Sequence, residues 1–171
     1  MMMDITSKKR RRQKGQAAIE TVLVIIPLFM VLLGILDFSV AIFVMDTMEY
    51  AARQGVRFAV LQQAGGTGHQ DDAIRMAVRN NSLGFLSNTS TVPDSQLTIN
   101  YYSLDPVSNT WVSATGADSN SGGNLIKVGV SGFSWAWMIP NWRPGVNGKL
   151  SISAAAADIM QGCPGGVCPG R

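Results

Sequence analysis

Histidine is almost absent from this chain of 171 residues, since His69 is the only one. A Ser-His-Asp site would therefore rest on His69 alone, and no serine pattern points to such a site. Asp71 and Asp72 follow closely, but two carboxylates and one histidine beside a polar stretch are more typical of a loop and a helix cap than of a metal site. We interpret this stretch as structural, and we expect no metal.

Cysteine is also scarce, and its two occurrences, Cys163 and Cys168, stand close together at the C-terminal end. Four residues separate them, which excludes the two-residue spacing of a redox-active C-x-x-C pair. Metal binding would need further ligands that the neighbouring sequence does not supply. Because proline and glycine between the cysteines favour a tight turn, we expect a disulfide formed in an oxidising compartment.

Motifs for phosphate and calcium binding are missing as well. No GK[ST] follows the glycine-rich stretches, so there is no phosphate-binding loop. The segment 116–124, GADSNSGGN, is rich in oxygen ligands but lacks the spacing and the closing Glu of an EF-hand. We interpret it as a polar turn, with calcium binding as the alternative. These absences predict a protein that has no cofactor and is not an enzyme.

Charge is concentrated at the front of the chain. The formal net charge is +3, yet residues 1–15 hold six of the fourteen Lys and Arg and one of the eleven acids. The leader is therefore +5 and the remainder, with eight basic residues and ten acids, is −2. A basic cluster directly before an apolar run is explained by membrane topology, so we expect no nucleic-acid partner.

A long apolar run follows the leader, and residues 21–36 contain no charged side chain. A helix needs about 20 mostly apolar residues to cross a hydrocarbon core of roughly 30 Å, so flanking residues must enter the bilayer too. No A-x-A-like site follows the run, which is typical of a retained anchor rather than a cleaved secretory signal. The positive leader should stay cytoplasmic and the rest should lie outside.

Four segments follow from this pattern. We expect a basic cytoplasmic leader at 1–15, a transmembrane helix at 16–45, an amphipathic continuation of that helix at 46–63 and an extracytoplasmic head at 64–171.

We expect the long helix to run from Ala17 to Gln63. Two residues within it allow further predictions. Pro27 should kink it. Asp37 should mark the outer membrane boundary or, as the alternative, face a partner helix.

Small residues recur every fourth position in the amphipathic part, at Ala51, Gly55 and Ala59. Small side chains at this spacing let another helix or a sheet approach closely. We interpret them as packing within the protein's own head. A contact between subunits is the alternative, and one face could serve both.

The head reads as an α+β domain in which a second helix packs on an antiparallel sheet of three to four strands. Asp71 or Asp72 should cap that helix, which should run to about Leu86 with Leu83 on its apolar side. The expected strands lie at 97–102, 111–112, 125–133 and 150–156.

Three tryptophans, Trp135, Trp137 and Trp142, fall in the segment 134–148, which we expect to be an irregular loop. In a small domain such side chains usually belong to the core. A partner or subunit contact and a membrane surface are the two alternatives.

Gly15 ends the basic leader, and Glu20 follows it by five residues. This start of the apolar run resembles the processing site of type IV-like prepilins. The resemblance implies that a prepilin peptidase cuts after Gly15, so that the mature chain begins at Gln16. A glycine should keep the scissile backbone extended and accessible. Glu20 would then neutralise the N-terminal amine of a neighbouring subunit. As the alternative, the Glu20 carboxylate only stabilises the first turn of the helix, by interacting with the positive end of the helix dipole.

Taken together, the Gly15/Glu20 start, Pro27, Asp37 and the AARQGVRFA stretch at 51–59 are similar to the TadE-like family. The resemblance implies a non-enzymatic minor pilin or pseudopilin of the Flp/Tad pilus in the bacterial inner membrane, with other pilins, pilus-assembly proteins and the prepilin peptidase as partners. Such a protein assembles into oligomers or a filament, and it can reach a surface pilus. The alternative is an uncleaved, signal-anchored binding module that uses the Trp-rich loop.

Overall fold

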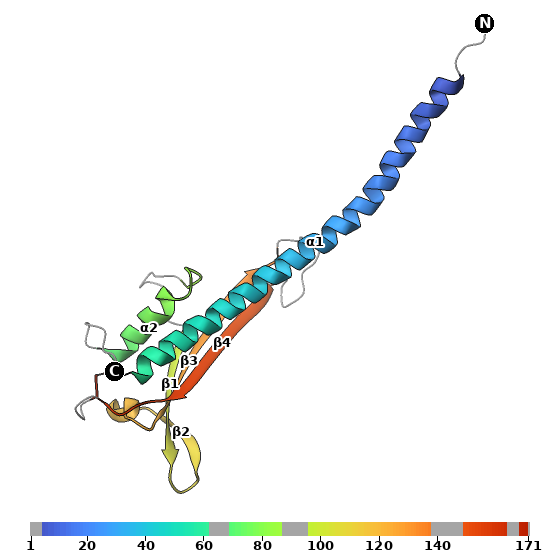
Figure 1. Cartoon of the computed structure of the whole chain (residues 1–171). Helices are drawn as coiled ribbons and strands as arrows, with labels where there is room; N and C mark the ends of the chain where they lie inside the picture. The colour runs from blue at the N-terminus through green and yellow to red at the C-terminus, as the bar shows by residue number, and fades with distance from the viewer. Residues whose placement is uncertain (1–4, 62–68, 87–95, 138–148, 164–167, 171) are drawn as a thin grey trace.

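The computed structural model consists of one long helix and a small head packed against its C-terminal part (Figure 1). It describes residues 5–61, 69–86, 96–137, 149–163 and 168–170. The long helix, the second helix and the four-stranded antiparallel sheet confirm the predicted α+β architecture.

Helix α1, Ile5–Val60, has 56 residues and is therefore roughly 84 Å long at about 1.5 Å per residue. It starts well before the expected Ala17 and ends before Gln63. Pro27 lies inside it without breaking it, and the helix curves gently along its length (Figure 1). Transmembrane helices tolerate a proline because neighbouring helices, Ser or Thr side chains, waters and small backbone adjustments satisfy the freed backbone groups.

Gly15 also lies within α1, so the expectation of an extended backbone at this glycine is wrong. The surrounding Lys, Arg, Gln and Ala residues are good helix formers. One interior glycine costs only about 1 kcal/mol relative to alanine, which its neighbours offset.

The sheet has the order β2-β1-β3-β4, and every neighbouring pair is antiparallel. The strands are β1, Leu97–Asp105; β2, Thr110–Ala114; β3, Leu125–Ala136; and β4, Lys149–Ile159.

Each strand is longer than expected, and residues 134–136 belong to β3 rather than to an irregular loop. They are held in the sheet because they pair with the start of β4, where Trp135 faces Leu150. The register shifts between Val130 and Phe133, where Gly132 has a φ of +79° that suits a glycine in a bulge. Residues 138–148, the rest of the expected loop, lie outside the described residues.

The second helix, α2, spans Gln70–Asn80, with His69 at its N-cap position. The prediction that Asp71 or Asp72 caps the helix is wrong, because both lie in its first turn. Their carboxylates still stabilise the helix there, by interacting with the positive end of the helix dipole. The helix also ends before Leu86. Leu83, with a φ of +52°, has left the helical region and is exposed instead of contributing to the apolar side.

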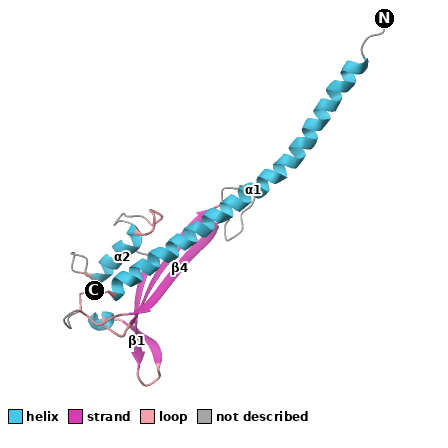
Figure 2. Ribbon diagram, viewed as in Figure 1, coloured by secondary structure: helices cyan, strands magenta, loops and turns pink. Residues whose placement is uncertain are grey.

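The core lies between α1, α2 and the sheet. Helix α1 runs along the sheet and contacts β3 and β4, while α2 lies beside α1 (Figure 2). Val128 is fully buried on the face of β3 toward α1, as the alternation of that strand predicts. Other core side chains come from all three layers: Met48, Val56, Ile74, Val78, Tyr101, Ile126, Val130 and Ile152.

Two contacts fix the direction of the sheet along α1. Trp135 in β3 reaches Asp37, whereas Val128 lies beside Gly55. Strand β3 therefore runs antiparallel to α1, so its C-terminal end points toward the uncovered part of the helix. The β1–β2 hairpin projects at the opposite end of the molecule (Figure 1).

Candidate functional site

The N-terminal half of α1 stands free of the head. Every side chain from Gln16 to Leu33 is exposed, and most of them are apolar. The stretch from Gly15 to Val60 meets the length and composition of a helix that can cross a membrane, and its most apolar window has none of its residues buried. An exposed apolar surface of this length indicates membrane anchoring.

The residues of the prepilin-like motif lie together at the start of this free helix. Gly15, Gln16 and Glu20 are all exposed, and a Cβ added at Gly15 would meet nothing within 4 Å. The Gln16 Nε2 donates a hydrogen bond of 3.4 Å to the Glu20 Oε1, one helical turn away. The carboxylate thus lies on the outside of the helix, where a group from another molecule can approach it.

Asp37 is the first side chain of the helix that the head buries, and only 1% of it is exposed. The Trp135 Nε1 donates a hydrogen bond of 3.1 Å to the Asp37 Oδ1, across 98 residues of sequence. The carboxylate is therefore covered by the protein's own sheet instead of facing a partner helix. This hydrogen bond joins the head to the helix. No local sequence pattern predicts it, because its two residues are far apart in the chain.

The tryptophans occupy distinct environments. Trp135 is half-buried against the core, and Trp137 is half-buried just past the end of β3. Trp142 lies outside the described residues. A fourth tryptophan, Trp111, is 42% exposed on β2 in the distant hairpin.

The small residues of α1 lie at the contact between the two helices and the sheet. Ala51 and Ala59 are fully buried. A Cβ at Gly55 would lie 2.4 Å from the Val78 Cγ2 in α2 and 3.6 Å from the Val128 Cγ1 in β3. Because real side-chain carbons do not approach so closely, only glycine fits at position 55 with α2 where it is.

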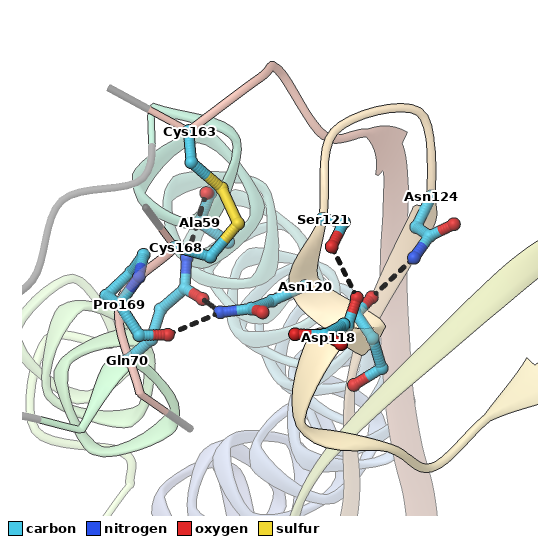
Figure 3. The surroundings of a disulfide bond; sticks show 10 residues. Ala59, Gln70, Asp118, Asn120, Ser121, Asn124, Cys163, Cys168 and Pro169 are labelled. Atoms are coloured by element: carbon cyan, nitrogen blue, oxygen red, sulfur yellow. Dashed lines mark hydrogen bonds between the residues drawn. A yellow bond between two sulfur atoms is a disulfide. The ribbon is translucent and has the colours of Figure 1, made fainter. Parts of the chain in front are cut away.

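The C-terminal tail is held by the predicted disulfide, Cys163–Cys168, and by a buried polar network (Figure 3). The Asn120 Nδ2 donates to the Pro169 carbonyl and to the Gln70 Oε1, both at 2.7 Å. The Gln70 backbone N–H donates to the Gly170 carbonyl at 2.8 Å.

The same network reaches the end of α1, because the Gln70 Nε2 donates to the Ala59 carbonyl at 3.2 Å. Asn120 closes the 3-10 helix η2, Ala117–Asn120, which replaces part of the expected polar turn. Segments of α1, α2, η2 and the C-terminal tail therefore meet at the buried side-chain amides of Gln70 and Asn120.

The stretch around His69 has a structural role in the part that is described. The Tyr101 hydroxyl donates a hydrogen bond of 2.7 Å to the Asp71 Oδ1, which ties α2 to β1. Within the described ranges, no three His, Cys, Asp or Glu residues gather as they would around a metal ion.

A single free apolar helix that continues into an α+β head is the layout of a pilin-like protein. The family model for TadE-like proteins matches residues 15–57, which confirms the resemblance predicted from the sequence. The match associates the chain with the Flp/Tad pilus. It covers about a quarter of the chain, from Gly15 to Arg57, and the rest of the head lies beyond it. Comparisons with curated proteins and with solved structures gave no significant match.

Proposed function

We propose that this protein is a minor pilin or pseudopilin, a structural component of Flp/Tad pilus assembly that is incorporated through its N-terminal helix. The observation that carries the proposal is that the family match, residues 15–57, spans both the free apolar part of α1 and the part that packs against the head. The match begins at Gly15, where the exposed apolar helix begins. The partners are other pilins and pilus-assembly proteins, and the product is an oligomer or a filament.

The protein resides in the bacterial inner membrane with its N-terminus in the cytoplasm and its head outside. The basic residues of 1–15 support this orientation. The bilayer should end near Asp37 rather than near Met45. The head already covers Asp37, Ala41 and Val44, and lipid cannot occupy the same face of the helix.

A prepilin peptidase cleaves after Gly15. Because this glycine is helical, the enzyme must unwind the helix locally before it can reach the peptide bond. Glycine favours this step, since the helical state is about 1 kcal/mol less stable at glycine than at alanine. Apart from the adjoining turns of its own helix, nothing lies within 4 Å of a Cβ position at Gly15, which leaves this side of the helix open to the enzyme.

Mass spectrometry of the membrane-extracted protein tests the proposal. We expect the chain to start at Gln16. Gly15→Leu should abolish cleavage, and Gly116→Leu, at a second glycine with free space around it, should leave cleavage intact. An unprocessed N-terminus in the unaltered protein would instead support the uncleaved anchor with a binding head.

A further inference from the structure

The end of the sheet nearest the free helix combines tryptophan and lysine. We call it the sheet tip: the last residues of β3, Trp135 and Ala136, the following Trp137, and the first residues of β4, Lys149 and Leu150. Ala136 pairs with Lys149, which is exposed, and Trp137 is half-buried.

The sheet tip lies at a defined level along α1, because Trp135 donates its hydrogen bond to Asp37. Asp37 is also the first helix residue that the head buries. The free part of the helix, from Gly15 to Leu36, is roughly 33 Å long at about 1.5 Å per residue. This length matches a hydrocarbon core of roughly 30 Å, so the outer edge of the core falls at the level of the sheet tip.

We propose that the sheet tip rests on the phospholipid headgroups of the outer face of the membrane. Tryptophan prefers the boundary between hydrocarbon and water, and a lysine ammonium pairs with lipid phosphate. The inference rests on the membrane span proposed above. The exposed face of α1 supports it, because Phe38 and Ile42, within roughly 8 Å past Asp37, remain 57% and 47% exposed.

The head is then fixed by two attachments. One is the helix in the bilayer, and the other is the sheet tip on the surface of the bilayer. The β1–β2 hairpin must point away from the membrane. Trp111 pairs with Leu104 in this hairpin, beyond the Tyr102–Leu125 pair that marks the far end of β3. At about 3.3 Å per residue, Trp111 lies roughly 40 Å from Trp135 along the sheet. It therefore serves as an internal control.

Quenching of tryptophan fluorescence by brominated lipids tests the proposal on the full-length protein in phosphatidylcholine/phosphatidylglycerol vesicles. One variant, Trp111→Phe/Trp142→Phe, retains the two tryptophans of the sheet tip. Its matched control, Trp137→Phe/Trp142→Phe, retains Trp111 together with Trp135. Both keep Trp135, so both keep its hydrogen bond to Asp37.

We expect lipids brominated near the headgroup to quench the first variant at least twofold more than the control. Lipids brominated near the chain end should quench both variants weakly. Lys149→Glu in the first variant should reduce quenching in anionic vesicles. Equal quenching in the two variants, with the protein floating with the vesicles, would overturn the contact of the tip with lipid. Failure to float would instead overturn the membrane span itself.

Discussion

Replacing Gly55 with alanine should destabilise the head, although alanine is the better helix former. The added methyl would lie 2.4 Å from the Val78 Cγ2, and Val78 and Ile74 are both fully buried. Valine is stiff at χ1, so α2 must move as a whole to make room. Overpacking of this kind costs about 3 kcal/mol, at the upper end of its usual range. The gain in helix propensity returns about 1 kcal/mol, which leaves about 2 kcal/mol of destabilisation.

Val78→Ala supplies the matched partner for this substitution. Alone it should cost about 2 kcal/mol, because two buried methyl groups are removed and a small cavity is left. In the double variant the alanine at position 55 occupies part of the vacated space and the clash disappears. The total loss should then be about 1 kcal/mol, rather than the roughly 4 kcal/mol that additivity gives.

Thermal unfolding of the full chain in detergent measures these values. The near-UV circular dichroism of tryptophan reports on the head, because all four tryptophans lie between residues 111 and 142. Gly55→Ala should lower Tm by about 10 °C, and the double variant should recover most of this loss. A higher Tm for Gly55→Ala would refute the close approach of the two helices. Additive single effects would show that Val78 is not the neighbour of Gly55.

The remaining predictions concern the assembly motif, the helix–head contact and the tail. Glu20→Gln should leave membrane insertion unchanged but reduce incorporation into pili, counted by immunoblot of sheared filaments; normal incorporation would reject a role for the charge. Asp37→Ala leaves the Trp135 N–H without its acceptor and should destabilise the head by about 1–3 kcal/mol. If Trp135→Phe costs as much on its own as it does in the Asp37→Ala background, the hydrogen bond contributes nothing. Removing the disulfide with Cys163→Ser/Cys168→Ser should cost about 2 kcal/mol, from the entropy of the short closed loop. It should also speed hydrogen exchange at the Gln70 amide, which donates to Gly170; unchanged exchange there would mean that the tail docks without the disulfide.

The parts of the molecule that the sequence predicts are those with local signals. The apolar run, the alternation of Ile126, Val128 and Val130 and the Gly15/Glu20 spacing each lie within a few residues. They define the long helix, the buried face of β3 and the family resemblance. The strand lengths were less predictable, because residues 134–136 join the sheet only through pairing with β4.

The contacts that hold the head to its helix could not be predicted in the same way. Asp37 and Trp135 are 98 residues apart, and an acid in an apolar run is equally compatible with a membrane boundary or a partner helix. Gln70 and Asn120 look like ordinary surface residues in sequence, yet they are fully buried because backbone carbonyls from the tail and from α1 surround them.

Labelling with a membrane-impermeant maleimide in spheroplasts tests the central claim, that α1 is embedded in the membrane while the head faces outward. The two native cysteines form a disulfide, so a single introduced cysteine reports alone. Ser113→Cys on the exposed hairpin should react at once. Leu28→Cys, at a position that is 54% exposed in the isolated chain, should react only after detergent dissolves the bilayer. Equally fast labelling of both cysteines in intact spheroplasts would contradict the account.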